Sequence, residues 1–525
     1  MQNRFKAVTS VFNFVFKFDN FLLVFLYSTM ETNQIVDFFK NQTLFLTGGT
    51  GFVGKLILEK LLRECPEIKK IFLIVRPKKG KTPQERFEEL FDMPCFELLK
   101  STKINISEKV SLVDGDCQEP FLDLSAQNLD LLREEVTCVI HAAANVKFDQ
   151  SLKEAAFNVR ATRDLLELAK QMPNLKSFVY VSTAYSNCLN PHIKEDFYEP
   201  PLKPENLLSV VNSLDDDVLT KITPSLLGPW PNTYIYTKSI TEDLVKSAST
   251  SLPIAIVRPA IIVSSMKEPI PGWIDNFYGV VGLVMGIGLG VIHSLHISLN
   301  APALIVTVDY VANLIITVAW KTGCETTKKT PIYNYITISK NQLTWGEFLK
   351  VMNSQYWNAL TDKIVWYYSC QIAESKLWHN IQIFFLHTVL GYVVDFVLFC
   401  LGRPTLAVKN YKRLNKLLEV TSFFTTRNWA FDDSNVRHLW NELSNNDKKT
   451  FEFYVDQVDW NKYAVDSISG GRKFLLKDTI DSLPRGRRKV KILLVAHYTL
   501  IAVFWFVVYK VWMFFFGSIF FKCVE

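Results

Sequence analysis

Two side chains, Tyr234 and Lys238, have the types and the spacing needed to deliver a proton to a carbonyl group under reduction. A spacing of four residues places both on one face of a helix. A hydride added to a carbonyl leaves an alkoxide, which needs a hydroxyl donor within hydrogen-bonding reach. The pKa of a free tyrosine is about 10, and an adjacent ammonium group stabilises the tyrosinate and lowers that pKa. In a chain with 19 tyrosines this spacing also arises by chance, so other motifs have to support it.

A glycine-rich segment has the residue types of a dinucleotide-binding turn. It consists of Thr47, Gly48, Gly49, Thr50, Gly51, Phe52, Val53 and Gly54. It stands between a predicted strand and a predicted helix, which is the context that gives such a motif meaning. Gly48 permits the tight turn, Gly51 lets the backbone approach the pyrophosphate, and Gly54 allows close packing of helix on strand. The N-terminus of the helix then offers free N–H groups to the phosphates.

The residues after the later strands indicate which dinucleotide binds. Arg76 follows the second strand with no acid nearby, and a basic residue there suits the 2′-phosphate of NADP(H) better than the free hydroxyl of NAD(H). Asp116 follows the third strand and is a candidate to face the adenine. Ala142 and Ala143 follow the fourth, where small side chains let the dinucleotide lie close. We therefore expect NADPH as the cofactor.

A parallel sheet has to position these residues. Short apolar runs alternate with helical stretches and predict strands at residues 43–46, 71–75, 110–113, 136–141, 178–182 and 254–258. Strands separated by helices are typical of a parallel sheet covered on both faces. The predicted fold class is α/β, with a Rossmann-type doubly wound sheet. After about residue 320 this alternation fades and aromatic-rich helices predominate.

The order of the motifs resembles the extended short-chain dehydrogenase/reductase superfamily. A glycine turn comes first, then Thr183 at the end of the fifth strand, then the helix with Tyr234 and Lys238. The resemblance implies that Thr183 binds the reacting carbonyl, that Tyr234 donates the proton, and that Lys238 lowers its pKa and holds the nicotinamide ribose. Asn158 matches the helix asparagine that supports the proton relay, although Arg160 stands where a glycine is usual.

Further blocks resemble the alcohol-forming fatty acyl-CoA reductases. They comprise residues 141–149, 256–259, 268–276, 333–335, 344–348, 429–432 and 458–460, with Asn145 where a threonine is commoner. This similarity runs from about residue 30 to beyond residue 510. It implies that a long-chain acyl-CoA and two NADPH give a primary fatty alcohol and CoA, through an enzyme-bound aldehyde and without a covalent cysteine. Phe277 and residues 280–291 are candidates to line an apolar tunnel for the acyl chain, although an ordinary core explains them as well.

Composition excludes several other classes. The chain has 525 residues, of which 49% are hydrophobic, and this amount of apolar sequence can bury a large core. The formal charge of +6 is spread out, so we expect no nucleic-acid partner. The nine cysteines form no CxxC pair and fit reduced thiols of a cytosol-facing protein. The eight histidines form no HExxH motif, so we expect no metal.

One segment near the C-terminus is long and apolar enough to cross a bilayer. Residues 492–509 carry no charge, and residues 485–491, just before them, are mostly basic. The positive-inside rule keeps that basic cluster cytosolic. A second apolar stretch, residues 381–401, contains His387 and Asp395. If both crossed, basic residues between them would become lumenal, so we expect this stretch to be monotopic or buried, with Asp395 turned away from lipid.

We therefore predict four regions: an extension of unknown role at 1–29, an NADP-binding reductase domain at 30–365, a helical domain at 366–480 and a transmembrane anchor at 492–516. The first region only faintly resembles a signal peptide, because Lys17 and Asp19 interrupt it. The expected location is a membrane crossed once, the endoplasmic reticulum in preference to the peroxisome, with the catalytic domain in the cytosol. Two alternatives remain: a tethered dehydrogenase for a sterol or other lipid carbonyl, and a catalytically silent scaffold.

Overall fold

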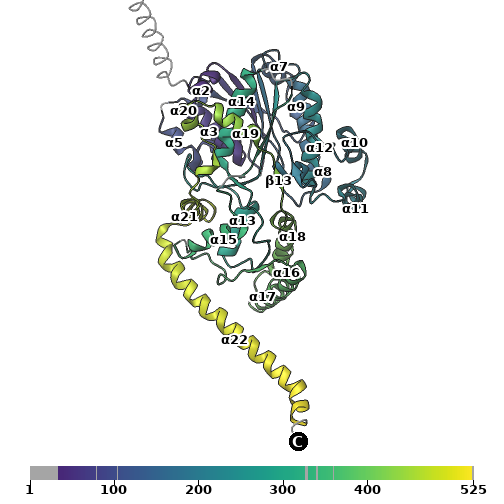
Figure 1. Cartoon of the computed structure of the whole chain (residues 1–525), viewed down its shortest axis with the longest axis vertical. Helices are drawn as coiled ribbons and strands as arrows, with labels where there is room; N and C mark the ends of the chain where they lie inside the picture. Colours follow the sequence, from purple (N-terminus) through teal and green to yellow (C-terminus); the bar gives the residue numbers. More distant parts are fainter. Residues whose placement is uncertain are drawn as a thin grey trace, which may run out of the picture.

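A computed structural model describes residues 33–522, apart from residues 79, 103, 326–328, 338–340 and 359. The predicted extension at residues 1–29 therefore lies outside the described residues. Figure 1 shows the sheet with its helices at one end of the molecule and a helical region at the other. From this second end a single long helix, α22 (Leu483–Lys522), projects away from the body.

A seven-stranded parallel sheet forms the centre of the larger region, in the order β11-β7-β5-β4-β1-β2-β3. The order reverses at β1, so a ligand crevice is expected beyond the carboxyl ends of β1 and β4. The strands are β1 (Thr43–Thr47), β2 (Lys70–Val75), β3 (Val110–Asp114), β4 (Cys138–His141), β5 (Ser177–Val181), β7 (Ile254–Pro259) and β11 (Ile332–Tyr335). The α/β prediction with a doubly wound sheet is confirmed.

Six of these strands match the predicted ones, with small shifts at their ends. The strand predicted from residue 136 begins at Cys138, because the N–H of Val136 still bonds to the Leu132 carbonyl and ends α7 (Ala126–Glu135). The sequence analysis missed β11 as a strand. This strand has four residues and contains the polar Asn334, whose side chain donates to the carbonyls of Ile193 and Asp432.

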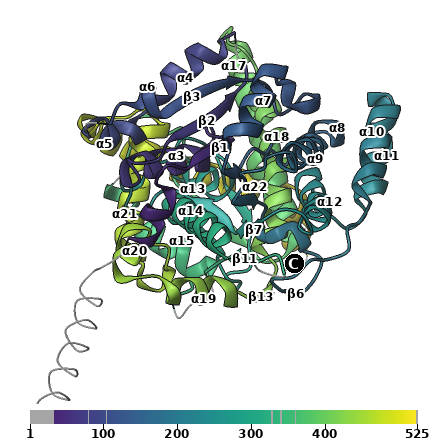
Figure 2. The same cartoon turned by 90° about the horizontal axis from the view of Figure 1, so that it is seen from above.

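Alternating strand residues supply two separate cores, one on each face of the sheet. Leu44 and Leu46 of β1 face α3 (Phe52–Glu64) and α14 (Val308–Cys324), whereas Phe45 between them faces α7, α9 (Phe157–Ala169) and α12 (Thr233–Ala248). Figure 2 shows these two helical layers from above. The α14 helix is apolar nearly all round because α3 covers one side and the sheet the other.

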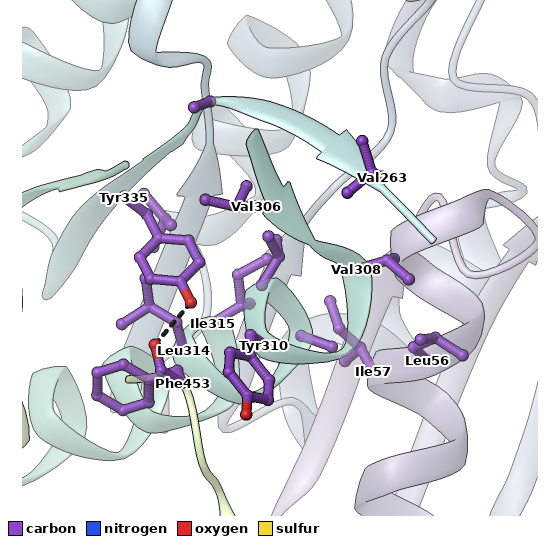
Figure 3. Close-up of a cluster of buried hydrophobic side chains, with 14 of the residues drawn as sticks. Leu56, Ile57, Val263, Val306, Val308, Tyr310, Leu314, Ile315, Tyr335 and Phe453 are labelled. Atoms are coloured by element: carbon purple, nitrogen blue, oxygen red, sulfur yellow. Dashed lines mark hydrogen bonds between the residues drawn. The ribbon is translucent and has the colours of Figure 1, made fainter. Parts of the chain in front are cut away.

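Part of the first core is drawn in Figure 3, where side chains of α3 and α14 meet those of two short strands. These strands, β8 (Ile261–Val263) and β10 (Ile305–Thr307), pair in parallel beside the main sheet. Beside them the hydroxyl of Tyr335, from β11, donates to the carbonyl of Phe453 at 2.6 Å. This bond ties the last strand of the sheet to the C-terminal part of the chain.

The remaining elements surround this framework. On the side of the sheet region they are α2 (Gln34–Phe39), α4 (Pro83–Phe91), α5 (Glu97–Lys100), α6 (Ile106–Lys109), α8 (Leu152–Ala155), α10 (Pro204–Ser213) and α11 (Asp216–Leu227). The helices α19 (Ser434–Glu442) and α20 (Asn445–Thr450) also lie at the sheet end of the molecule. The helical region contains α13 (Gly279–Gly288), α15 (Trp345–Ser354), α16 (Lys376–Ile383), α17 (Leu390–Cys400), α18 (Ala407–Thr425) and α21 (Trp460–Gly470). Two further parallel strand pairs join distant segments: β6 (His192–Ile193) with β13 (Ala430–Phe431), and β9 (Ser294–His296) with β12 (Gln371–Ala373).

Contacts between residues far apart in the sequence join the C-terminal helices to the sheet region. The Asp447 carboxylate accepts hydrogen bonds from the backbone N–H groups of Gln34 and Ile35, at 3.1 and 3.3 Å, and so caps α2 from 413 and 412 residues away. Gly272 packs directly on the backbone of Asp466 in α21, where a side chain would have no room. The C-terminal helices are therefore part of the same packed body as the sheet.

Two helices of the described chain are long and apolar enough to cross a membrane, Lys376–Cys400 and Leu483–Phe514. Both lie at the lower end of the molecule in Figure 1. The first keeps its polar side chains inward: Asp395 accepts the N–H groups of Ala407 and Val408 at 2.8 and 3.0 Å, which caps α18. Large apolar side chains cover its other face, with Phe396 67% exposed.

Candidate active site

The glycine turn lies at the carboxyl end of β1, beside the residues that follow β4. Gly48 has a positive φ of 76°, and a Cβ on it would lie 2.7 Å from the backbone of Ala142 and Ala143. A Cβ on Gly54 would lie 2.1 Å from the Gly48 carbonyl oxygen, so only glycine fits either position. Gly51 precedes α3 and supplies no side-chain cap, which leaves the first N–H groups of that helix for a ligand.

A buried hydrogen-bonded chain holds this turn. The Thr47 hydroxyl accepts the N–H of Ala143 at 3.3 Å and lies 2.7 Å from Nδ1 of His141. The opposite ring nitrogen of His141 lies 2.9 Å from the hydroxyl of Thr162 on α9. Burial lowers the pKa of His141 to about 3, so its ring is neutral at physiological pH. His141 therefore positions Thr47 and the Ala142–Ala143 backbone and is no general base.

Two arginines lie beside the glycine turn. Arg76 bonds to the side chain of Gln118, and its Nη1 lies 3.7 Å from Oδ2 of Asp116. Arg86, on α4, donates to the Arg76 carbonyl, and its Nη2 donates to the hydroxyl of Thr50 at 3.4 Å. Burial and the charge of Arg76 lower the pKa of Arg86.

The sequence analysis missed Arg86. The capping box of Thr82 and Glu85, with Pro83 at the first helical position, marks the start of α4 and was the signal that could have placed Arg86 near the turn. Two guanidinium groups in this place form a better site for a phosphate than Arg76 alone.

Lys238 reaches the carboxyl end of β5. Its ammonium group donates to the Val181 carbonyl at 2.6 Å and to the Tyr180 hydroxyl at 3.2 Å, and it lies 4.5 Å from the centre of the Tyr180 ring. Burial lowers the pKa of Lys238 to about 7. Burial also raises the pKa of Tyr234.

Asn158 lies between the residues after β4 and the helix that carries Tyr234. Its side-chain oxygen accepts the N–H of Asn145 at 3.0 Å, and its amide donates to the Thr237 hydroxyl at 3.2 Å. The same hydroxyl donates to the Tyr234 carbonyl at 2.9 Å. The side chain of Arg160 turns the other way and bonds to the Gln118 carbonyl, near Arg76. The arginine in place of glycine therefore lies toward the side of the predicted adenosine.

Thr183 is held between two buried serines. Its hydroxyl accepts the N–H of Tyr185 at 3.4 Å at the start of a short helical turn. Ser182 and Ser186, on either side of it, donate to one carboxylate oxygen of Glu242 at 2.6 and 2.8 Å. Glu242 lies one turn after Lys238 on α12. The segment with Thr183 is thus fastened to the helix with Tyr234 and Lys238, through a residue that the sequence analysis missed.

An aromatic wall from the C-terminal region lies next to Tyr234. The ring of Phe148 lies 6.1 Å from that of Tyr234 and 5.9 Å from that of Phe424, at the end of α18. Phe424 also contacts Tyr185 at 4.9 Å. Tyr236, in contrast, is buried and packs against Trp230. The helical region therefore contributes one apolar side of the site.

The structure gathers the predicted residues at one edge of the sheet. The glycine turn, Ala142 and Ala143 lie at the ends of β1 and β4, with Arg76 and Asp116 beyond β2 and β3. Asn158, Thr183, Tyr234 and Lys238 adjoin the ends of β4 and β5 through the bonds described above. Among the described residues no group of three or more His, Cys, Asp and Glu side chains is suited to a metal ion.

This arrangement is that of a nicotinamide-dinucleotide-dependent reductase with a Rossmann-type fold. Among solved structures, the fold is similar to the reductase domain of a nonribosomal peptide synthetase from Mycobacterium tuberculosis, with a TM-score of 0.55, 17% identity, and coverage of 85% of this chain and 96% of that one. The terminal R domain of the myxalamid PKS-NRPS pathway is also similar, with a TM-score of 0.54, 19% identity, and coverage of 82% and 90%.

Sequence comparison identifies the family within this class of reductases. Two profiles described as male sterility protein, the first of them NAD-binding, match residues 46–315 and 386–478. Fatty acyl-CoA reductase wat of Drosophila melanogaster is 36% identical over 469 residues, which cover 89% of this chain and 90% of that protein. Fatty acyl-CoA reductase 1 of Homo sapiens is 36% identical over 456 residues, 87% and 88% of the two chains. The chain belongs to the fatty acyl-CoA reductase family, as the sequence motifs predicted.

Proposed function

We propose that this protein reduces long-chain fatty acyl-CoA to the primary fatty alcohol, with two NADPH consumed and CoA released. One observation carries the proposal: Lys238, on the same helix as Tyr234, is buried at the carboxyl end of β5 next to the Thr183 segment, at the sheet edge that also holds a glycine turn with no room for a side chain. The similarity to fatty acyl-CoA reductases over nine-tenths of the chain supports the substrate class.

The side chains fit both reduction steps. The dinucleotide, when bound, supplies the hydride. Addition to the thioester carbonyl gives a hemithioacetal oxyanion, to which we assign the hydroxyl groups of Thr183 and Tyr234 as hydrogen-bond donors. Loss of the CoA thiol then leaves an aldehyde, and its reduction places the charge on the same oxygen. Burial keeps Tyr234 protonated, so it has a proton to give to this alkoxide. Asn158 and Thr237 hold the helical turn that carries Tyr234.

The two arginines support NADPH rather than NADH as the reductant. Arg76 and Arg86 approach the end of β2 from different elements, beside Thr50 of the glycine turn. A 2′-phosphate at this point would receive charge-assisted hydrogen bonds from planar guanidinium groups. Asp116, 3.7 Å from Arg76, keeps that guanidinium oriented.

The location we propose is a membrane that the chain crosses once, with the catalytic domain in the cytosol and the endoplasmic reticulum favoured over the peroxisome. The exposed apolar face of α22 supports the crossing, and the basic residues 485–491 at its start support the cytosolic side. The inward Asp395 supports an in-plane position for residues 376–400. The functional division remains a reductase domain at 30–365, a helical domain at 366–480 and an anchor at 492–516.

Membranes from cells expressing the full chain provide the test. They are incubated with NADPH and acyl-CoAs of graded chain length, and the products are identified by gas chromatography. We expect fatty alcohol from long chains, with two NADPH oxidised for each alcohol. If the membranes oxidise NADPH only with a sterol or another lipid ketone, the substrate class is wrong. If no carbonyl compound is reduced at all, the protein is a silent scaffold.

A further inference from the structure

A cavity in the helical region has no role in the mechanism proposed above. It lies between α13, α15 and the segment after α21, and its volume is about 710 Å³ when the space at its mouth is included. Its walls are mainly aliphatic, with Val284, Ile287, Leu289, Leu349 and Leu476 among them. A lining of this kind suits a lipid-like ligand. Val284, Ile287 and Leu289 belong to residues 280–291, which were predicted to line an acyl tunnel, whereas Phe277 is 49% exposed and is not part of the wall.

The outer wall of this cavity packs on the base of α22. Residues 360–368 form a strap between the two, and within it Leu360 and Ile364 are buried against Val490. Gly486 lies so close to the strap that a Cβ there would be 2.9 Å from the Thr361 carbonyl carbon. Ile492, where the apolar run begins, is about 9 Å further along the helix axis. The cavity therefore lies beside the point where the proposed anchor enters the bilayer.

The inner end of the cavity leads toward the reductase site. A smaller hollow of about 310 Å³ shares four lining residues with it, among them the flexible side chains of Met285 and Met352, and reaches Val263 on β8. The next residues after Val263 contact Trp273, which stacks at 5.3 Å on Phe52, the first residue of α3 after the glycine turn. The two hollows together therefore extend from the base of α22 to β8, next to the segment whose Trp273 packs on the nucleotide-binding helix.

One buried hydroxyl group in the lining donates no hydrogen bond within the described part of the chain. The hydroxyl oxygen of Tyr356 is buried, and no acceptor for its proton occurs among the described residues. A buried hydroxyl group without a partner costs about 1–3 kcal/mol. Such a group is normally satisfied by water or by a ligand. The lining also contains Arg472, but its guanidinium is already bonded to Asp478 and Ser482. A mainly apolar cavity with the Tyr356 hydroxyl as donor matches a molecule with a long alkyl chain and a single oxygen at its head.

We propose that this cavity binds a long-chain fatty alcohol, whose hydroxyl oxygen accepts a hydrogen bond from Tyr356 while its chain lies on the aliphatic wall. The identity of the ligand rests on the proposed function, since the alcohol is the product of that reaction. Its chemistry, a single alkyl chain with an oxygen head, rests on the cavity alone. The site lies between the reductase region and the bilayer, which is the path that a water-insoluble product has to take.

Photolabelling of the full-length protein in phosphatidylcholine nanodiscs tests this site. The probe is a 16-carbon alcohol with a diazirine in its chain, and hexadecanol is the competitor. We expect labelled peptides that contain Met285 and Met352, with the label lost when hexadecanol is added. A diazirine-bearing phosphatidylcholine is the second arm. If it labels the same peptides and hexadecanol does not compete, the occupant is a membrane lipid and the proposal is wrong.

Three variants sharpen the test. Leu349→Trp fills the cavity and should weaken hexadecanol binding about tenfold, equivalent to about 1.4 kcal/mol. Lys350→Trp adds the same ring to the exposed neighbouring position and should change nothing. Tyr356→Phe should weaken binding about fivefold through loss of one hydrogen bond. Unchanged labelling of Leu349→Trp contradicts the proposal, and if that variant fails to fold, the competition result on the unaltered chain decides. Reductase activity is measured separately, so labelling without alcohol formation would refute the proposed function alone.

Discussion

The Glu242 carboxylate accepts two hydrogen bonds from Arg258, at 2.9 Å from Nε and 2.6 Å from Nη2, and both side chains are almost fully buried. Arg258 ends β7, and Glu242 lies one turn after Lys238 on α12. The hydrogen bonds of Arg258 hold Glu242 ionised and keep its pKa low in spite of burial. This pair therefore fixes the distance between the helix with the predicted proton donor and the strand edge with Thr183.

Removing the charge of Glu242 should damage both stability and catalysis. In Glu242→Gln the buried guanidinium of Arg258 loses its counterion, and breaking a buried pair in this way costs about 3–5 kcal/mol. We expect a lower melting temperature and a fall in kcat that exceeds the change in KM, because the Thr183 segment loses its fixed position. Asp243→Asn, the next residue, removes only a partly exposed pair with Lys203 and is the matched control. Equal behaviour of the two variants would contradict the positioning role.

The role of Tyr234 is tested by a pair of tyrosines on the same helix. Tyr234→Phe removes the proposed proton donor and should lower fatty-alcohol formation by about 10²-fold or more, with protein level unchanged. Tyr236→Phe removes a hydroxyl from a buried tyrosine that packs against Trp230 and should keep most of the activity. The measurement is the rate of alcohol formation in membranes at saturating NADPH. Full activity of Tyr234→Phe would remove it from the mechanism.

The lowered pKa of Lys238 leads us to expect a specific pH dependence of kcat. Burial disfavours its ammonium form, so its pKa in the folded protein, about 7, lies below the ordinary value. The charged form is therefore present below pH 7 and is lost as the pH rises through that value. We expect kcat to fall on the alkaline side of about pH 7 as the ammonium group disappears. In Lys238→Arg the guanidinium stays charged, and any remaining activity should lack this alkaline limb. A limb that persists in this variant assigns the titration to another group.

The cofactor preference should depend on both arginines. Arg76→Ala and Arg86→Ala should each raise the KM for NADPH about tenfold, because a hydrogen bond to a charged group contributes about 1.5–3 kcal/mol. The KM for NADH, which carries no 2′-phosphate, should change little, and Arg76→Asp should shift the preference toward NADH. Lys81→Ala removes an exposed charge near the same strand, paired with Glu89, and is the control. If the KM values for NADPH and NADH rise by the same factor, the two arginines do not bind the 2′-phosphate.

Membrane attachment should depend on two separate segments. Deletion of residues 492–525 should release most of the protein from microsomal membranes into the soluble fraction. A residual bound fraction is expected from α17, whose Phe396 and Phe399 are 67% and 73% exposed. Adding Phe396→Asp and Phe399→Asp to the truncated chain should remove this bound fraction, because a charged side chain in lipid is costly. If the double variant binds membranes as well as the truncated chain does, α17 does not contact lipid.

Local sequence was enough to predict six of the seven strands, since each is an apolar run between helical stretches. It also predicted the glycine turn, because Gly48 and Gly54 are demanded by contacts within a short segment. The sequence did not predict the functional side chains whose partners lie far along the chain. Glu242 bonds to serines 56 and 60 residues earlier, and Arg86 reaches Thr50 across a change of element. Periodicity shows which face of a helix is apolar, but it does not show which distant residue meets the other face.

The bond from Asp447 to the backbone of Gln34 and Ile35 has a consequence for the order of events during synthesis. The first helix of the described chain obtains its cap only after residue 447 has left the ribosome. Gly272 likewise gains its packing contact only after Asp466 of α21 has been synthesised. The reductase region therefore completes its packing late in translation, shortly before α22 emerges. We therefore expect a nascent chain arrested before residue 447 to remain open to proteases along α2.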